Sequence, residues 1–397
     1  MRTLLRLSGV AVLGAAFVHC SADGTATHDD LDAGMPPLND DGSSPIDGGA
    51  GSPDVQSDVD IADAGNCSAD HWCRTLLPEP APSLTAVWSF AADDAIAAST
   101  EKMFHWDGAT WSAVDAPAAE GLTSLWASSP TDVWGVSQYS RRLAHGTRAG
   151  AGRPFTWTKV EFDAETTPTM DIVRGAGNEL WVYGQLNGEH VLSRGTVTFE
   201  SGADGGSTPT VSWTTLPIAF PELTTVSSFW VTADGKVWLA GLASAGWLQA
   251  GAVIVGVPRA DDPGRHDWEK ALQDTPGDYV GLTAIWGAST ELWAIGNVGH
   301  NFRGGLGADG GVAFRPVASN AKTTMRSIWG SGPNDVWIVG EAGGIRHWDG
   351  TEWSVSRVAI GGIPLWQNLT AVHGRPDGDV WAVGDGVALH RVTGGAP

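Results

Sequence analysis

The sequence predicts an all-β fold, a seven-bladed β-propeller with four strands in each blade, from three observations. A nine-residue phrase, clearest at 329–337 as Trp-Gly-Ser-Gly-Pro-Asn-Asp-Val-Trp, returns in weaker copies along the 397-residue chain. The copies recur every ~40 to 55 residues, which is the period of a four-stranded blade. Each copy places a turn rich in Gly, Pro, Asn and Asp between two strands. Seven such repeats fit within residues 67–397.

Each repeat can be aligned by one anchor residue in its first strand and one in its second. A third strand follows less regularly, and a fourth then opens with an aromatic residue. The first-strand anchors are Trp88, Trp126, Arg174, Trp230, Trp286, Trp329 and His373, and the second-strand anchors are Ile96, Trp134, Trp181, Trp238, Trp293, Trp337 and Trp381. The fourth strands open with Trp111, Trp157, Trp213, Trp268, Phe314 and Trp353.

The seventh repeat lacks a fourth strand at the C-terminal end of the chain. A matching segment occurs near the other end, where His71-Trp72-Cys73-Arg74 aligns with the fourth strands around Trp157 and Trp213. An N-terminal strand around Trp72 is therefore expected to complete the last blade. This closure removes an exposed sheet edge that would otherwise pair with other chains.

Regular repetition decides how the aromatic residues are interpreted. Of 21 tryptophans, all but Trp247 and Trp366 fall at repeated positions. An indole repeated once per blade is expected to fill the gap between twisted sheets, because each large aromatic side chain buries ~150 to 250 Å². The same argument favours packing over metal ligation for His105, His347 and His390, which recur at one place in the third strand. The glycine-rich stretch 304–307 is interpreted as a flexible connection between strands.

The charge of the chain is strongly acidic, with a formal net charge of −22. A nucleic-acid partner is excluded on this ground, because binding to phosphates needs a basic face. Residues 23–66 alone hold eleven aspartates and no lysine or arginine. With few large apolar residues and many like charges, the segment 21–66 is predicted to be a disordered acidic linker.

The first twenty residues have the pattern of an export signal. Arg2 and Arg6 precede an apolar run from Leu7 to Val18, which is too short to span a bilayer, and Cys20 follows. The segment resembles a bacterial lipoprotein signal, and this resemblance implies lipidation of Cys20. Cleavage after Ala22 is the alternative, because His19 is not the small residue preferred before that cysteine. The remaining cysteines, Cys67 and Cys73, are expected to form a disulfide bond in an oxidising compartment, which requires a turn between them.

The repeats resemble those of secreted and lipid-anchored bacterial β-propellers with a Trp-Gly-x-x-x-x-Asp-Val-Trp-x-Val-Gly signature, and more distantly Asp-box propellers. The resemblance covers residues 84–397, and the hairpins 106–111 and 348–353 match the Asp-box position with Asp and Gly adjacent instead of separated. The resemblance to lipoproteins, in which Ser21 and Ala22 after Cys20 give no inner-membrane retention signal, implies a lipid-anchored location at the bacterial outer membrane or cell surface. A soluble periplasmic or secreted protein is the alternative.

Among relatives of this kind, a sialidase-like enzyme would need a tyrosine nucleophile and three arginines spread over several blades. The chain has three tyrosines, Tyr139, Tyr183 and Tyr279, and none lies in a matching motif. Its arginines cluster in one loop that is expected to be a solvated face, at Arg141, Arg142, Arg148 and Arg153. No serine elbow, phosphate-binding glycine loop or zinc-protease sequence is present, and no cofactor or metal is expected.

Departures from the repeat mark the candidate binding face. In a propeller, the loops between second and third strands and those between blades emerge on the same face. The second strands end near Gln138, Gln185, Leu242, Asn297, Glu341 and Asp385, which would form a broken polar ring. Trp247 and Trp366 lie in the same loops and are the preferred contacts, with Tyr139, Tyr279, His300 and Asn301 as weaker candidates.

Two functions are compatible with the sequence. The first is a non-catalytic, envelope-tethered monomer that binds protein or polysaccharide through the loop face, since fold alone carries no chemistry. The second is a glycosidase-like or lyase-like enzyme that uses Glu341 and Asp385. Paired catalytic carboxyl groups in glycosidases stand ~5 to 9.5 Å apart, so the positions of these two side chains distinguish the alternatives.

Overall fold

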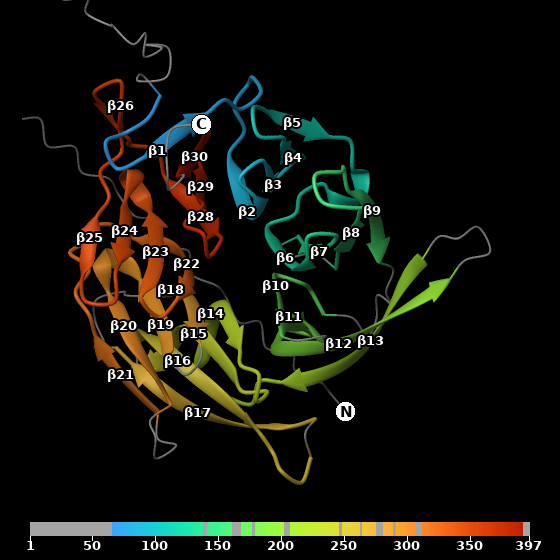
Figure 1. Ribbon diagram of the computed structural model, residues 1–397. Helices are drawn as coiled ribbons and strands as arrows, with labels where there is room; N and C mark the ends of the chain where they lie inside the picture. Colours follow the sequence, from blue (N-terminus) through green and yellow to red (C-terminus); the bar gives the residue numbers. More distant parts are fainter. Residues whose placement is uncertain are drawn as a thin grey trace, which may run out of the picture. The chain divides into compact units, whose positions relative to one another are not determined.

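The computed structural model describes residues 66–137, 141–160, 168–176, 179–201, 207–245, 248–262, 264–274, 281–288, 291–306 and 312–391. These residues form seven four-stranded antiparallel sheets and one short two-stranded hairpin. Figure 1 shows the sheets arranged as blades around a common centre. The predicted signal segment, Cys20 and the predicted linker up to residue 65 lie outside the described residues. Within the described part of the chain, no helix is long and apolar enough to cross a membrane.

Six blades are built from four consecutive strands. Blade 1 comprises β2 (Leu84–Ala91), β3 (Asp94–Ser99), β4 (Met103–Trp106) and β5 (Trp111–Val114); blade 2 comprises β6 (Ser124–Ser129), β7 (Asp132–Val136), β8 (Leu143–Thr147) and β9 (Thr156–Val160). Blade 3 comprises β10 (Ile172–Ala176), β11 (Glu179–Leu186), β12 (Glu189–Ser201) and β13 (Ser207–Pro217); blade 4 comprises β14 (Leu223–Val231), β15 (Val237–Ala245), β16 (Leu248–Pro258) and β17 (His266–Gln273).

Blade 5 comprises β18 (Leu282–Ala288), β19 (Glu291–Gly296), β20 (Asn301–Leu306) and β21 (Val312–Pro316); blade 6 comprises β22 (Met325–Gly332), β23 (Asp335–Gly340), β24 (Ile345–Trp348) and β25 (Trp353–Val355). Blade 7 takes β28 (Leu369–Gly374), β29 (Val380–Gly384) and β30 (Val387–Arg391) from the C-terminal part, and its fourth strand is β1 (Trp72–Thr75). The hairpin β26 (Ala359–Ile360) and β27 (Ile363–Pro364) lies between blades 6 and 7, and short 3-10 turns occur at η1 (Pro117–Ala119), η2 (Asn297–Gly299) and η3 (Glu341–Gly343).

The predicted anchors pair as expected in every blade. Each first-strand anchor lies directly opposite its second-strand anchor, as in Trp329↔Trp337 and Arg174↔Trp181. The second-strand tryptophans are almost completely buried, at 0 to 3% exposure. The prediction of seven four-stranded blades is therefore confirmed.

Glycines in the third strands make room for the aromatic residues of the fourth. Gly146, Gly195 and Gly256 lie opposite Trp157, Trp213 and Trp268, and Gly304 lies opposite Phe314. A Cβ atom at Gly304 would lie 2.6 Å from the Phe314 ring. The interpretation of 304–307 as a flexible connection is thus wrong for residues 304–306, which belong to β20.

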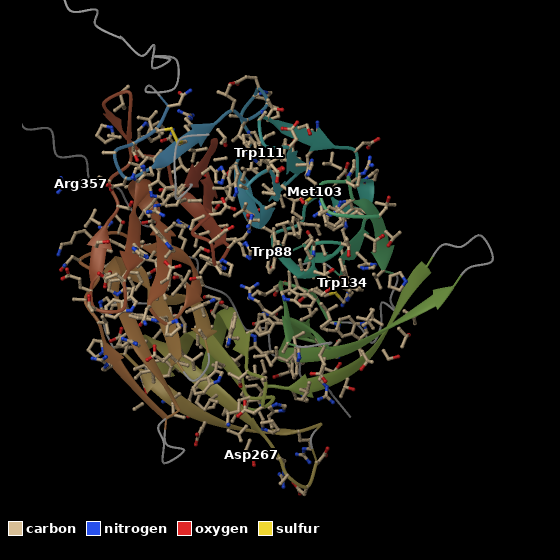
Figure 2. The ribbon with its side chains drawn as sticks, in the orientation of Figure 1. Trp88, Met103, Trp111, Trp134, Asp267 and Arg357 are labelled. Atoms are coloured by element: carbon tan, nitrogen blue, oxygen red, sulfur yellow. A yellow bond between two sulfur atoms is a disulfide. The ribbon has the colours of Figure 1, made fainter. Side chains whose placement is uncertain are left out.

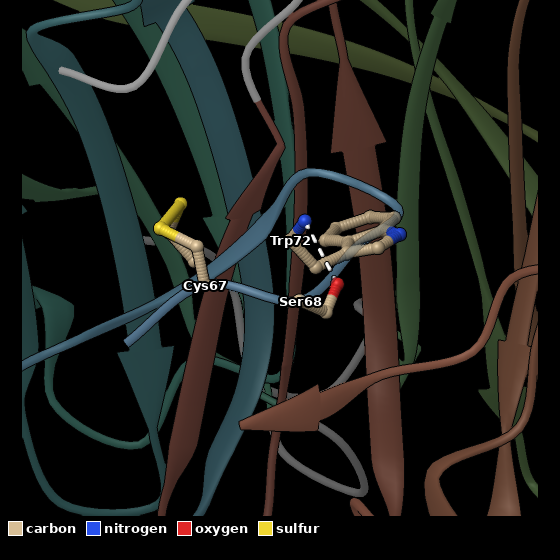
Figure 3. Close-up of a disulfide and its surroundings, with 4 residues drawn as sticks. Cys67, Ser68 and Trp72 are labelled. Atoms are coloured by element: carbon tan, nitrogen blue, oxygen red, sulfur yellow. Dashed lines mark hydrogen bonds between the residues drawn. A yellow bond between two sulfur atoms is a disulfide. The ribbon is translucent and has the colours of Figure 1, made fainter. Parts of the chain in front are cut away.

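The N-terminal strand closes the ring. Trp72 pairs with Arg391 and Thr75 with Ala388, so β1 forms the outer strand of blade 7. The Trp72 indole is fully buried and donates a hydrogen bond to Ser356 Oγ at 2.9 Å in blade 6. The structure contains a Cys67–Cys73 disulfide bond, and Trp72 N–H donates to Ser68 Oγ within the bridged turn (Figure 3).

Glycine after the first-strand tryptophan has a packing role. The indole of one blade lies over the glycine of the next, and a Cβ at Gly175 would stand 1.8 Å from a Trp126 ring atom. The same contact joins Trp230 to Gly287, Trp286 to Gly330 and Trp329 to Gly374. The Trp-Gly phrase therefore encodes a contact between adjacent blades rather than within one.

Second strands begin with a carboxylate that pairs with a cation or a histidine of the third strand in six blades. In blades 2, 6 and 7 the histidine ring also stacks on the second-strand tryptophan at 4.0 to 4.2 Å between centroids. In blades 3 and 5 the pair is Glu179–Arg194 and Glu291–Arg303. The recurring histidines thus sit in packed ion pairs, and the described residues hold no group of three or more potential metal ligands.

Candidate functional site

Strand direction gives the ring two different faces. The loops from second to third strands and those between blades emerge on one side, here named the loop face. The turns from first to second and from third to fourth strands emerge on the other, named the turn face. The carboxylate pairs at the start of the second strands all belong to the turn face.

Large apolar side chains are exposed on the loop side only, among the described residues. Leu76 follows the last residue of β1, Val355 ends β25, Val298 lies in η2, and Ile363 and Trp366 lie in the connection from blade 6 to blade 7. Their exposed fractions run from 50% for Val355 to 73% for Trp366 and Leu76. All five belong to blades 5 to 7, so the exposed apolar surface covers one arc of the loop face.

Trp366 is carried by a loop that backbone hydrogen bonds hold in place. Leu365 N–H donates to Val358 O at 2.9 Å across the β26–β27 hairpin, and Gly343 N–H donates to Gln367 O at 2.8 Å. Asn368 Oδ1 accepts a hydrogen bond from Ala342 N–H at 3.2 Å. The loop is therefore held on both sides of the exposed indole, by Val358 before it and by η3 of blade 6 after it.

Residues of the predicted polar ring that can be described lie at the ends of second strands. Their backbone N–H groups donate to the segment that precedes the first strand of the same blade: Glu341 to Thr324, Asp385 to Asn368 and Asn297 to Gly281, each on the carbonyl oxygen. Gln185 uses the Thr169 hydroxyl instead, at 2.9 Å. Leu242 instead lies within β15, which continues to Ala245. Gln138, Tyr139, Trp247 and Tyr279 lie outside the described residues.

Glu341 and Asp385 have separate partners. Arg326 donates to Glu341 Oε1 at 2.7 Å, whereas Asp385 accepts from Ser83 at 2.7 Å and from Asn368 at 3.1 Å. Burial raises the pKa of Glu341, but hydrogen bonds from Arg326 and Thr324 outweigh it, so the pKa is lowered. Both carboxylates are acceptors of local hydrogen bonds in different blades.

The second-to-third-strand loops of blades 5 and 6 share an unusual backbone. Val298 and Ala342 have φ of 50° and 52°, in the left-handed region. This conformation is costly for a β-branched residue such as valine, and strain of this kind is found where a loop conformation is functionally required. Next to the loop of blade 5, His300 Nδ1 lies 2.7 Å from a carboxylate oxygen of Asp274. The side-chain amide of Asn301 is buried without a hydrogen-bond partner among the described residues.

All seven first strands line the central channel, which has a volume of about 630 Å³. The first-strand anchors meet here: Trp88, Trp126, Arg174, Trp230, Trp286, Trp329 and His373. Figure 2 shows Trp88 beside the channel, whereas Trp111 of the fourth strand lies farther out. The channel wall is thus an aromatic ring interrupted by one arginine and one histidine. The sequence contained the signal, since Arg174 and His373 break a row of tryptophans, but alignment alone did not place that row on a cavity.

The arginine loop differs from its prediction. Arg148 is buried, donates to both carboxylate oxygens of Asp94 at 3.0 and 2.6 Å, and lies between the rings of Phe90 and Phe155. The expectation of a solvated face is therefore wrong for Arg148, because a carboxylate from the neighbouring blade 1 compensates its charge. Arg142 donates to Glu120 O at 2.7 Å and remains part-exposed.

No protein-family model and no curated protein matches the chain. Solved structures match it by shape. YCF48 bound to D1 peptide is similar with a TM-score of 0.57 and 17% identity, over 82% of this chain and 97% of that one. The extracellular domain of BT4673 from B. thetaiotaomicron reaches 0.55 at 13% identity, over 82% of this chain and 40% of that one. The WD40 propeller domain of Doa1 reaches 0.51 at 10%, over 78% and 92%.

At these identities the likeness concerns architecture. The similar structures are seven-bladed β-propellers, and they include a bacterial extracellular domain and binding or scaffold-type domains. The chain shares its fold with them: a closed ring of seven four-stranded blades.

Proposed function

We propose that this protein is a non-catalytic, exported binding module, anchored at the cell envelope through a lipid on Cys20, that engages a protein partner through the loop face of blades 5 to 7. The observation that carries the proposal is Trp366, whose side chain is 73% exposed on a loop fixed by hydrogen bonds. A rigid, exposed tryptophan is the residue type that most often dominates binding at a protein interface.

The neighbours of Trp366 favour a protein partner over a polysaccharide. Ile363 and Val298 add exposed aliphatic surface on the same arc, which suits the apolar centre of a protein interface. Polar groups around it, including Glu341 and Asp385, can form the rim. The similar structure of YCF48 is described with a bound peptide, which supports the same class of partner for this chain.

The absence of catalysis is proposed from the environment of the two ring carboxylates. A glycosidase keeps one carboxyl group protonated by raising its pKa, and the second acts beside it. Glu341 is instead ion-paired with Arg326 and has a lowered pKa, while Asp385 is occupied by Ser83 and Asn368. Neither side chain is held as a proton donor.

Capture of envelope proteins by the immobilised protein tests this proposal. Trp366→Ala combined with Ile363→Ala should abolish saturable capture of an identified partner, because truncating a hot-spot residue typically costs ~2 kcal/mol or more, or ~30-fold in affinity. A matched control carries Thr110→Ala and Glu352→Ala, two exposed residues of the turn face. Its capture should equal that of the wild type.

The outcomes separate the alternatives. Equal capture by the wild type and the Trp366/Ile363 variant would remove the proposed face. Retention of polysaccharides but no proteins, with the same dependence on Trp366, would change the class of partner. Release of products from a panel of glycosides would overturn the non-catalytic proposal, provided that Glu341→Gln or Asp385→Asn abolishes the release.

A further inference from the structure

Arg174 is a cation inside the channel without a carboxylate partner among the described residues. Its Nη1 donates to Ser124 Oγ at 3.3 Å and to Val173 O at 2.8 Å, both uncharged acceptors. Burial lowers the pKa of Arg174 to about 10, and the guanidinium stays protonated at neutral pH. Its Nε and Nη2 groups have no acceptor within the described part of the protein.

The other charged groups on the channel wall are accounted for. Arg326 is ion-paired with Glu341 at 2.7 Å, and Asp171 stands one residue before β10, at the loop-face end of the strand. Asp171 has an interaction partner, and the hydrogen bonds of the Arg174 guanidinium go to uncharged oxygen atoms. Arg174 is therefore a channel cation without an ion-pair partner among the described residues, and it can attract an anion from the channel.

His373 provides a second donor at the same level of the ring. Its Nδ1 accepts a hydrogen bond from Ser89 N–H at 3.1 Å, and its ring stacks on Trp88 at 4.0 Å. Burial lowers its pKa to about 3; the charge of Arg174 acts in the same direction and that of Asp379 opposes it. The ring is therefore neutral with its proton on Nε2, which has no partner among the described residues.

The five indoles of this ring supply an apolar wall with further donors. Trp88, Trp126, Trp230, Trp286 and Trp329 line the channel. Each indole N–H is a donor only. The anchor side chains thus give the channel wall hydrogen-bond donors and aromatic ring faces. Among the described lining residues, the anionic side chain is that of Asp171.

Blade 4 is adapted to the arginine. After four of the five first-strand tryptophans, the next blade carries a glycine over which the indole packs, as at Gly287 and Gly330; after Trp88 the residue is Ala127. After Arg174 the corresponding residue of blade 4 is Val231, which is buried. Valine is larger than glycine and fills the space that an indole would need. Blade 3 therefore has arginine in place of tryptophan, and blade 4 has valine in place of glycine at the matching position.

We propose that the central channel is a binding site for a carboxylate group, held by the guanidinium of Arg174 against the indole wall. Arginine binds carboxylates through two parallel hydrogen bonds, and Nε and Nη2 of Arg174 have no acceptor among the described residues. One guanidinium matches a singly charged carboxylate better than a doubly charged phosphate. The indoles select ligands in which an aromatic or aliphatic group adjoins the carboxylate. This site does not depend on the proposed loop-face interaction.

The carboxylate could belong to a small molecule or to the C-terminus of a peptide, and the choice of probes distinguishes these two sources. Calorimetry and tryptophan fluorescence of the whole protein would be followed with benzoate, phenylacetate and hexanoate, and in parallel with short peptides that end in a free carboxyl group. The corresponding amides of each probe are the matched ligands. Saturable binding of the acids and not of the amides is expected, and the better series identifies a small molecule or a chain end.

Arg174→Gln should weaken this binding about tenfold or more, since it removes a charge-assisted hydrogen bond at nearly constant size. Arg174→Lys keeps the charge and should bind between the wild type and Arg174→Gln, which guards against a folding defect in the first variant. Arg259→Gln, an exposed arginine in blade 4, removes the same charge elsewhere and should bind as the wild type does. Equal binding by Arg174→Gln, no preference for acids over amides, or no binding of any acid would each overturn the proposal.

Loss of the two functions can be told apart. Trp366→Ala should abolish protein capture and leave carboxylate binding unchanged, because Trp366 does not line the channel. Arg174→Gln should instead weaken the binding of small acids and leave protein capture unchanged. If the free acid of a peptide end is the natural ligand, both variants should weaken capture of the same partner.

Discussion

The loop face and the turn face of the ring use polar and apolar residues in opposite ways. On the turn face, carboxylates such as Asp335 and Asp379 are bound to histidines and to serines of the adjoining strands. On the loop face, Val298, Ile363 and Trp366 are left exposed, and a valine holds a left-handed backbone. Repetition around the ring is strong on the turn face and breaks down on the loop face.

This difference separates stability from recognition. Polar groups that hydrogen-bond to one another within the ring contribute to folding stability. Their donors and acceptors are already used and are not available to a ligand. Groups that are exposed, strained or unpaired contribute little to folding and remain available. Mutations on the two faces should therefore act on different measurements.

The largest effect is expected at Asp94 on the turn face. Asp94→Ala leaves the buried guanidinium of Arg148 without its partner, and breaking a buried ion pair costs ~3 to 5 kcal/mol. Urea denaturation of the variant should show this loss, with Arg148→Met in the same background recovering part of it. A change below ~1 kcal/mol would show that the pair contributes no more than an exposed one.

Acid should weaken the turn face first. Burial raises the pKa of Asp94, but hydrogen bonds from His105, Arg148 and Gly152 outweigh it, and the pKa of Asp94 lies far below its ordinary value. The pKa of Asp335 is lowered in the same manner, mainly by His347 and Ser331 against burial. Their stabilisation is thus present above pH ~4 and is lost as pH falls below the unfolded value. Thermal denaturation between pH 2 and 7 measures it, and Asp94→Asn should flatten the curve.

Opening the Cys67–Cys73 bridge should have an intermediate effect. Cys67→Ala with Cys73→Ala removes a short closed loop next to β1, which the chain-entropy model values at ~2 kcal/mol. Within residues 66–391, limited proteolysis should then cut near Trp72 before any other site. Unchanged resistance would mean that pairing with β30 alone secures the strand.

Relief of strain on the loop face should be slightly stabilising. Val298→Gly removes a β-branched residue from a left-handed conformation, for an expected gain of ~1 kcal/mol. Ala342→Gly in blade 6, at the equivalent position, should gain less because alanine is not branched. A loss of stability at Val298 would show that its side chain makes a contact that outweighs the strain.

The smallest effect on stability is expected at Trp366. Trp366→Ala should change the free energy of unfolding by less than ~0.5 kcal/mol, as is usual for exposed residues. Thermal denaturation beside the capture assay checks this. A large loss would assign Trp366 to packing and contradict the division between the faces.

The fold could be predicted from the sequence because the same residue pattern recurs in each blade. The patterns are local: two anchors lie opposite each other, a glycine lies opposite a large ring, and a hairpin joins two aromatic residues. Because they repeat, a blade can be recognised even where another residue replaces the tryptophan, as at Ile96 or Phe314. The site did not follow in the same way. Arg174 and His373 were visible as exceptions, but their meeting across one channel depends on closure of the ring. The partner of Arg148 lies in another blade, and no local pattern links it to Asp94.

Closure by β1 also sets the order in which the molecule can be completed. Thr75 Oγ1 donates a hydrogen bond to Ala388 O, 313 residues away along the chain. During synthesis from the N-terminus, the first strand to emerge therefore has no sheet to join until the last blade has been made. Blades 1 to 6 can fold one after another from local contacts, which are quick to form. Only the final step converts a row of blades into a ring, and until then the row keeps two free ends.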